Sequence, residues 1–381
     1  MHSRKHRLTV VALVAFWGCA SFLWSPAPLT VAAEELPRLL SDEAFWRIAT
    51  EFSEPGGYFR SDNFISNELK FQHVIPSLEQ ITQPGGVYLG VGPDQNFTYI
   101  VALEPKIAFI VDIRRQNMLL HLMYKALIEM SADRADFASR LFSRRRPMSL
   151  ASTARPEEIF KTYNAISPDK ILYETNLKSV IDRLEKGHGF RLTPEDERSI
   201  RYVYKAFFDA GPYITYSFSN FGGGRRMPTY QELMEETDPQ GVNRSYMANE
   251  TNFQFLKKLH KNNLIVPLVG DFAGNKAIRS VARYLKEHNA IVTAFYLSNV
   301  EQYLFQDPEN WKKFYTNVGT LPLDSSSTFI RSVFNGMGGV YTGGSYGSMR
   351  SENKLSSMLN TIRAFNDGEI TGYSDVIRMF R

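Results

Sequence analysis

Residues 86–112 place the strongest constraint on how this chain can fold. The run Gly86-Val-Tyr-Leu-Gly-Val-Gly-Pro-Asp94 reads as a buried strand that passes into a glycine turn, and residues 95–103 have the pattern of a short helix. A second apolar run, residues 106–112, ends on an acid, Asp112. Strand, glycine turn, helix and a strand ending in an acid are typical of the start of a doubly wound α/β fold. We therefore expect a mostly parallel sheet covered by helices on both faces.

The same alternation resumes near the end of the chain. Residues 264–271 predict a strand that ends at Gly-Asp271, residues 275–288 a helix, and residues 290–296 a further strand. Residues 329–334 predict a late strand, and residues 354–365 a final helix. The fold class expected from both halves is a doubly wound, Rossmann-like α/β sheet.

The stretch between the two halves is too long to be a single connection. Residues 131–262 are mainly charged and helical in pattern, with one possible strand at residues 213–218, and we interpret them as a helical insertion. Residues 34–130 then hold the N-terminal helices and the first half of the Rossmann-like domain. Residues 263–381 hold its second half and a C-terminal helix.

The N-terminus has the order of a secretory signal. A basic start without acids is followed by an apolar run, residues 8–24, and by small side chains at Val31 and Ala33. We predict a signal peptide over residues 1–33. The alternative is an uncut anchor formed by residues 8–24, although this run is slightly short for a span and a pair of prolines follows it. Both interpretations place the remainder outside the cytoplasm, in the periplasm or secreted.

Composition narrows the kinds of partner. Removal of residues 1–33 takes away three basic residues and no acid, so the formal net charge falls from +4 to +1 and a nucleic-acid partner is not expected. Cys19 is the sole cysteine, so the mature chain has no thiol and no disulfide. No two histidines of the mature chain lie at helical spacing, and we expect no metal. We expect a small-molecule ligand, with membrane contact only through the signal or anchor segment.

The glycine turn and the acid after it favour a nucleoside-type pocket. Gly90 and Gly92 let a ligand approach the amides at a helix start. Asp112 follows about 20 residues later, where an acid accepts hydrogen bonds from ribose hydroxyls. The alternative is a tight turn of the kind found in any α/β protein. The third glycine of the dinucleotide fingerprint is missing, which argues against NAD or FAD.

This arrangement resembles the class I S-adenosylmethionine-dependent methyltransferase fold. Four stretches also resemble an uncharacterised bacterial family with this fold, and the resemblance covers roughly residues 57–130 and 262–335. The four stretches are residues 61–68, 90–99, 109–117 and 296–303.

The resemblance implies a site at the carboxyl ends of the strands. The glycine turn would face the amino-acid part of S-adenosylmethionine, the acid after strand two the ribose, the acid after strand three the adenine, and the residues after strand four the methyl group. The implied cofactor-binding residues are Gly90, Gly92, Asp112, Asp271, Asn67 and Ser298. The candidate catalytic residues are Asn299, facing the methyl acceptor, and Glu301, as a base.

Several of these residues have a plainer alternative. Glu301 also fits a helix start or a packing role. Asn67 and Glu68 could line the pocket from the upstream segment, or they could cap a helix. Arg114 and Arg115 fit either an anionic ligand or a solvated helix start. The glycine-rich runs 222–226 and 336–347 fit flexible loops, with a lid over the pocket as the second interpretation of the later one.

Two departures from the methyltransferase pattern stand out. The acid expected two positions before the first glycine is Tyr88, and the third glycine position holds Asp94. A carboxylate there would repel the carboxylate of the cofactor, unless it caps the following helix.

Two hypotheses of different class follow. The first is an exported methyltransferase-like enzyme of unknown substrate that binds S-adenosylmethionine or a related nucleoside. The second is a non-catalytic exported protein that reuses the fold for another ligand or a protein partner. The export signal favours the second, because S-adenosylmethionine has no usual supply outside the bacterial cytoplasm.

Overall fold

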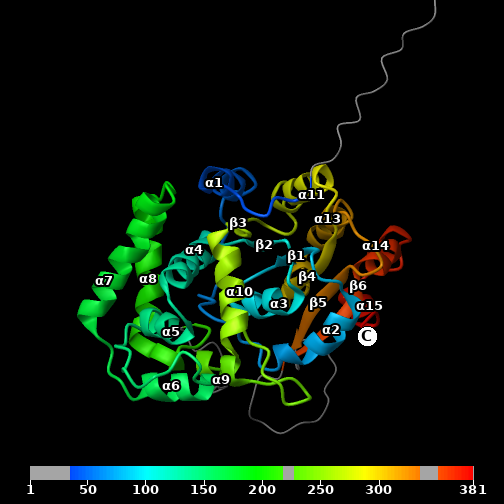
Figure 1. Ribbon diagram of the computed structural model, residues 1–381. Helices are drawn as coiled ribbons and strands as arrows, with labels where there is room; N and C mark the ends of the chain where they lie inside the picture. The colour runs from blue at the N-terminus through cyan, green and yellow to red at the C-terminus, as the bar shows by residue number, and fades with distance from the viewer. Residues whose placement is uncertain (1–34, 218–226, 335–350, 381) are drawn as a thin grey trace, which may run out of the picture. The chain divides into compact units, whose positions relative to one another are not determined.

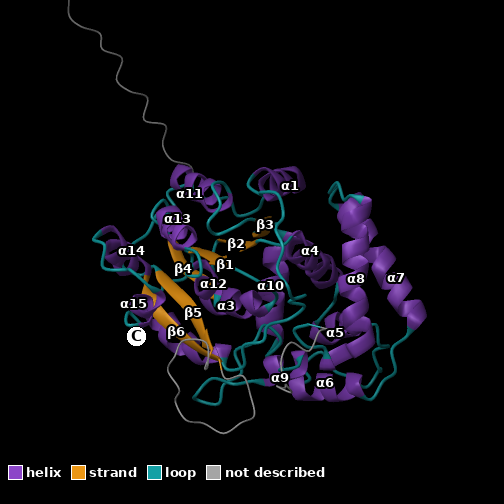
Figure 2. Cartoon of the chain, turned by 180° about the vertical axis from the view of Figure 1, so that it is seen from behind, coloured by secondary structure: helices purple, strands orange, loops and turns teal. Residues whose placement is uncertain are grey.

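A six-stranded sheet lies at the centre of the computed structural model, which describes residues 35–217, 227–334 and 351–380. The strand order is β3-β2-β1-β4-β5-β6, in which β1 to β5 run parallel and β6 runs antiparallel to β5 (Figure 2). This confirms the predicted Rossmann-like α/β fold. The strands are β1 (Val87–Gly90), β2 (Ile107–Asp112), β3 (Ile265–Val269), β4 (Val292–Ser298), β5 (Thr328–Phe334) and β6 (Ser351–Ser357).

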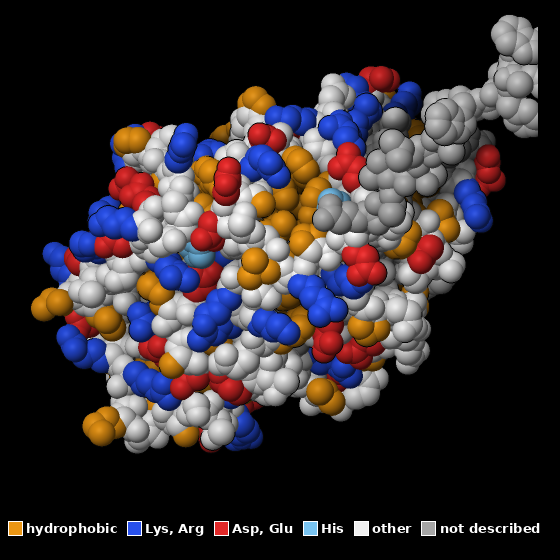
Figure 3. Space-filling model, turned by 45° about the horizontal axis from the view of Figure 1, so that its top comes forward, with side chains coloured by type: hydrophobic (Ala, Val, Ile, Leu, Met, Phe, Trp, Pro, Cys, Tyr) orange, Lys and Arg blue, Asp and Glu red, His pale blue; other side chains and the backbone are white. Residues whose placement is uncertain are grey.

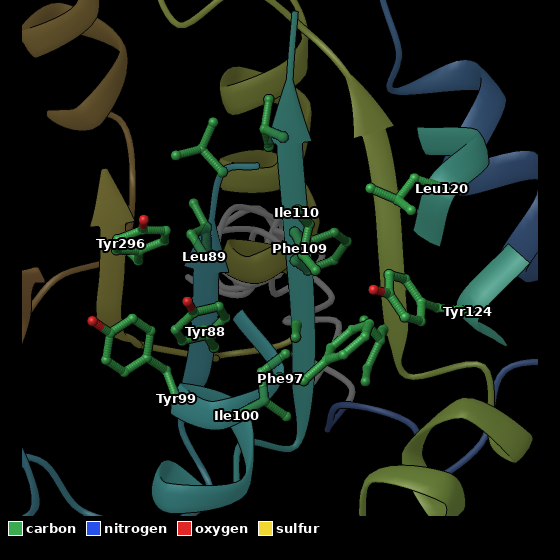
Figure 4. Packing of buried hydrophobic residues seen from close by; sticks show 14 of the residues in the cluster. Tyr88, Leu89, Phe97, Tyr99, Ile100, Phe109, Ile110, Leu120, Tyr124 and Tyr296 are labelled. Atoms are coloured by element: carbon green, nitrogen blue, oxygen red, sulfur yellow. The ribbon is translucent and has the colours of Figure 1, made fainter. Parts of the chain in front are cut away.

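The three strands β1, β2 and β3 are buried along their whole length. A parallel strand with helices on both faces has no polar side to show to water, and this is why these segments read as continuous apolar runs. Leu89, Phe109 and Ile110 pack at the centre of this layer (Figure 4).

Helices cover both faces of the sheet (Figure 1). On one face lie α3 (Gln95–Leu103), α4 (Arg115–Met130) and α10 (Glu250–Lys261), and their aromatic and imidazole rings meet around Phe97. On the other face lie α11 (Ala277–Glu287) and α13 (Pro308–Val318), which reach the sheet through ring contacts with Phe109 and Phe295. The remaining helices outside the β2–β3 connection are α1 (Asp42–Glu51), η1 (Phe71–Val74), α2 (Ile75–Ile81), α12 (Val300–Leu304), α14 (Met358–Asn366) and α15 (Tyr373–Ile377).

The regular elements in the described part of the connection from β2 to β3 are helices. The predicted strand over residues 213–218 was wrong: within the described part of that range, the pairing is a single bridge between Thr215 and Thr229. A short helix that the sequence pattern did not predict follows this bridge. The helices between α4 and α10 are α5 (Arg134–Phe142), α6 (Pro156–Asn164), α7 (Lys170–Asp182), η2 (Arg183–Gly187), α8 (Pro194–Ala210), η3 (Gly211–Tyr213) and α9 (Tyr230–Glu235).

The predicted helix over residues 354–365 was wrong in its first turn. Residues up to Ser357 belong to β6, and α14 begins at Met358. The run Ser-Glu-Asn-Lys-Leu-Ser-Ser is polar, so neither helical nor strand periodicity stands out in it. It becomes a strand because it pairs along its full length with β5, from Thr328 to Phe334. Long-range pairing decides this segment where local propensity does not.

The surface agrees with the small net charge expected of the mature chain. Basic and acidic side chains are interspersed over the face shown in Figure 3. Among the described residues, no helix is both long and apolar enough to cross a membrane.

Candidate functional site

The predicted site residues lie along one edge of the sheet. Gly90, Asp112 and Ser298 are the last residues of β1, β2 and β4, while Asp271 and Asn299 come just after β3 and β4. Because these four strands are parallel, their carboxyl ends share an edge, and the order changes direction between β1 and β4. The residues are nevertheless spread along that edge. Asp271 and Asn299 follow strands three places apart, about 14 Å at ordinary strand spacing.

The glycine turn is held closed from inside by Asn96. The Asn96 amide donates hydrogen bonds to the carbonyl oxygens of Val91, at 2.9 Å, and Pro93, at 2.7 Å. A Cβ at Gly90 would lie 1.9 Å from Oδ1 of Asn96, so this position needs glycine for an internal contact. Tyr88, in the place of the expected acid, is buried and donates to the same Oδ1 at 2.8 Å.

Gly92 is the open part of the turn. Its φ is +76°, and a Cβ there would meet no atom within 4 Å. The carbonyl oxygen of Gly92 lies 2.8 Å from Nε2 of His121, whose pKa is lowered to about 4 by burial. A neutral imidazole can donate this hydrogen bond. The turn therefore leaves backbone at Gly92 for a ligand to approach, but not at Gly90.

Asp94 does not cap α3, so the capping interpretation was wrong. Its carboxylate is buried and accepts a hydrogen bond from the Tyr246 hydroxyl at 2.8 Å, and Tyr246 in turn lies 2.5 Å from the hydroxyl of Tyr230. Burial raises the pKa of Asp94 to about 7 against the opposing effect of the Tyr246 hydrogen bond. The third glycine position thus holds a buried acid that points into the helical insertion.

Asp112 is bound by an arginine of its own chain. Arg114 approaches it with two parallel bonds, Nε to Oδ1 and Nη2 to Oδ2, both at 3.1 Å, and the backbone amide of Arg114 donates to Oδ1 at 2.9 Å. The exposed fractions of the two side chains are 7% and 5%. The carboxylate that would hold a ribose is therefore buried and already paired. Arg115, the second basic residue, pairs instead with Asp196 of α8, at 2.6 Å.

A segment that we call the strap, Ser53–Asp62, crosses the carboxyl ends of β2 and β3. Arg114 holds its end, because Nη1 donates to the carbonyl oxygens of Ser61, at 3.1 Å, and Asp62, at 2.6 Å. The middle is tied by the Gly57 amide, which donates to the carbonyl oxygen of Ile113 at 2.7 Å. A shallow pocket lies between the strap and the start of α4, beside Arg114.

Glu54 of the strap occupies the edge next to Asp271. Its Oε1 accepts from the backbone amides of Lys276 and Ala277, both at 2.8 Å, at the start of α11. Asp271 itself closes a local turn by accepting from the Ala273 amide at 2.9 Å. The position near the adenine in the resemblance is thus covered by the chain. The helix start that would attract an anion already holds a carboxylate.

Glu301 lies in a buried ion pair. Its carboxylate accepts from Arg331 Nε at 2.5 Å and from the hydroxyl of Tyr315 at 2.7 Å, and both charged side chains are almost fully buried. Nothing in this geometry supports the role of a base. Asn299 is half-buried, and its amide lies 3.4 Å from Oε1 of Gln302.

Glu68 is the centre of a buried polar cluster at the ends of β1 and β4. Its Oε1 accepts from the hydroxyls of Tyr296, at 2.8 Å, and Ser298, and its Oε2 accepts from the amides of Gln95 and Asn353, both at 3.0 Å. Burial and the charge of Glu68 raise the pKa of Tyr296 far above its ordinary value, so the hydroxyl stays neutral. Asn67, the neighbouring candidate, is half-buried.

The sequence patterns did not identify some of the residues whose side chains form hydrogen bonds at the carboxyl ends of the strands. Asn96, Glu54 and Asn353 are polar residues with no motif around them, and each makes contacts with segments that are distant or on another element. A buried asparagine one turn after a glycine loop is the one local signal that was available for Asn96. The glycine-rich runs 222–226 and 336–347 lie outside the described residues.

The candidate site lies within a region that matches a known family model. A family model described as a domain of unknown function (DUF7790) matches residues 63–358, well over half of the chain. The chain belongs to the DUF7790 family. The DUF7790 match includes all of the candidate site residues and Glu68, whereas the strap up to Asp62 precedes it. No curated protein matches the chain.

The raised pKa of Asp94 gives a stability effect with a defined sign. Between its ordinary value of 3.8 and about 7, the folded state keeps a proton that the unfolded state has lost, so Asp94 makes the folded state less stable as pH rises through this window. We expect Asp94→Asn to gain stability relative to the unmodified chain between pH 4 and pH 8, by roughly 4 kcal/mol at most. Urea unfolding across this range measures the difference.

A surface acid serves as the control for this prediction. Asp182 pairs with Lys178, and that hydrogen bond lowers its pKa, so Asp182→Asn should not gain stability as pH rises. A stability difference between Asp94→Asn and the unmodified chain that stays constant from pH 4 to pH 8 would show that Asp94 is charged throughout.

Proposed function

We propose that this protein is an exported, non-catalytic ligand-binding protein that reuses a methyltransferase-like fold and does not hold S-adenosylmethionine. Its ligand would be a small molecule bound at the carboxyl ends of β1 and β4, where the strand order changes direction. Ser298 ends β4 and Asn299 follows it, while the open backbone at Gly92 follows β1, the neighbouring strand of the sheet.

The pairing of Asp112 with Arg114 is the observation that carries the proposal. A ribose bound at Asp112 needs acceptor positions that Arg114 now occupies with three hydrogen bonds. Separating a buried carboxylate from its arginine costs about 3–5 kcal/mol, more than the two ribose hydroxyls return. Release of Arg114 would also break its two bonds to the strap.

Two further features of the edge support the same conclusion. Asn96 fills the turn beside Gly90, and Glu54 occupies the start of α11 next to Asp271. Three of the positions that the resemblance assigns to the cofactor are therefore in contact with the chain itself. The predicted export signal over residues 1–33 agrees with a protein that has given up a cytoplasmic cofactor.

Methyl transfer is the second candidate function, and one observation favours it. Gly92 has a positive φ and open space at its Cα, which is what a ligand needs in order to approach the amides of the turn. This candidate requires Arg114 to leave Asp112 and the strap to lift away.

Calorimetry of residues 34–381 distinguishes the two functions. We expect no heat from S-adenosylmethionine or S-adenosylhomocysteine at millimolar concentration, because Arg114 occupies the ribose position. Asp112→Asn is the matched variant. If the unmodified chain binds S-adenosylhomocysteine and Asp112→Asn weakens that binding by about 10–100-fold, the size of a lost charged hydrogen bond, then the protein holds the cofactor and our proposal is wrong.

Fractionation of cells that express the full-length chain tests the location. We expect a soluble protein outside the inner membrane whose N-terminal residue is Glu34, as N-terminal sequencing would show. An uncut chain retained in the membrane fraction would support the anchor over residues 8–24 instead. Recovery in the cytoplasm would contradict export.

A further inference from the structure

Glu68, like Asp94, is a buried acid without a basic partner among the described residues, but it accepts more hydrogen bonds than Asp94. Asp112, Glu129 and Glu301 each pair with a basic side chain, namely Arg114, Lys125 and Arg331. Glu68, with an exposed fraction of 1%, accepts its four hydrogen bonds from neutral groups, and in the described residues no lysine, arginine or histidine pairs with it. A buried carboxylate without an opposite charge is costly, so the cluster is electrostatically incomplete.

The same cluster contains a buried acceptor atom that has no hydrogen-bond partner. Asn353 has an exposed fraction of 5%, and its amide nitrogen donates to Glu68 and, at 3.1 Å, to the hydroxyl of Tyr99, while its Oδ1 has no hydrogen-bond partner. Ser332 lies opposite Asn353 in the pairing of β5 with β6, and its hydroxyl is likewise buried without a partner. Among the described residues, what the cluster lacks is a donor that carries positive charge.

Ser298 connects the cluster with the outer part of the edge. It is half-buried, and its hydroxyl donates to Glu68. Its φ is +50°, and the register between β4 and β5 shifts between Tyr296 and Ser298. A serine held in the left-handed region costs about 1 kcal/mol or more, and such positions are concentrated at functional sites.

We propose that Glu68, Ser298 and the Oδ1 of Asn353 bind a primary ammonium group, so that the ligand of this protein is an amine or an amino acid. An ammonium group supplies one positive charge and three N–H donors. The ammonium takes the position at Oε1 of Glu68 that the Ser298 hydroxyl now fills, so a charged donor replaces a neutral one, and the freed serine oxygen and the asparagine oxygen accept the remaining donors. Replacing a neutral hydroxyl costs less than separating Asp112 from its arginine. This inference rests on the proposed function, because it names the chemical class of the ligand bound at the ends of β1 and β4.

Thermal unfolding of residues 34–381 with methylammonium chloride as the probe tests the inference. At 100 mM we expect methylammonium to raise Tm by about 2 °C over sodium chloride at the same ionic strength. Tetramethylammonium chloride carries the same charge without N–H donors and should give no rise. Glu68→Gln keeps the shape of the side chain but removes its charge, and it should abolish the rise.

Two more variants keep the test decisive. Ser298→Gly removes the hydroxyl but suits the positive φ, so it should fold and show a smaller response even if Glu68→Gln does not fold. Asp94→Asn is the matched control, because it removes another buried carboxyl group, next in the chain to the Gln95 that donates to Glu68, and it should keep the full response. Urea unfolding of each variant shows whether it is folded.

Three results would overturn the inference. The first is an equal rise in Tm for Glu68→Gln and the unmodified chain. The second is a larger rise with potassium chloride than with methylammonium chloride, which would indicate a metal cation site. The third is no rise in Tm with methylammonium chloride. These results are independent of the calorimetry with S-adenosylhomocysteine. Cofactor binding would contradict the proposed function while leaving the response at Glu68 intact, and loss of the methylammonium response would leave the closed Asp112 position intact.

Discussion

The bidentate bond between Arg114 and Asp112 is the interaction on which this edge of the protein depends. It neutralises the acid at the end of β2, and the same guanidinium holds the strap through the carbonyl oxygens of Ser61 and Asp62. One side chain thus joins the end of a strand, the start of α4 and a segment about fifty residues earlier in the chain. Arginine suits this task because its planar group donates in several directions at once.

The same principle operates at the neighbouring positions of the edge. A Rossmann-like sheet exposes backbone amides, carbonyl oxygens and helix starts at the carboxyl ends of its strands, and these groups need partners when they are buried. In this protein Asn96 and Glu54 satisfy them from within the chain. The chain therefore fills the edge at β2 and β3 with its own charged side chains, whereas the cluster around Glu68 at β4 has neutral partners and includes the unpartnered Oδ1 of Asn353.

The fold could be predicted from the sequence because parallel strands that are buried on both faces leave continuous apolar runs. The antiparallel strand β6 could not, because its polar residues become a strand only through pairing with β5. The positions of Gly90 and Asp112 were predicted correctly, but their contacts were not. Glycine at residue 90 leaves room for the side chain of Asn96, and Asp112 binds Arg114. The sequence pattern alone does not distinguish these internal contacts from contacts with a ligand. Glu68 could be named from the sequence as a candidate for lining the pocket, but its bonding partners could not, because Gln95, Tyr296, Ser298 and Asn353 come from distant segments.

A crystal structure of residues 34–381 grown with saturating S-adenosylhomocysteine tests the central claim most directly. Our account predicts Arg114 in bidentate contact with Asp112, the strap in place across β2 and β3, and no nucleoside at the edge. Ribose hydroxyls bonded to Asp112, with Arg114 turned away and the strap displaced, would contradict it.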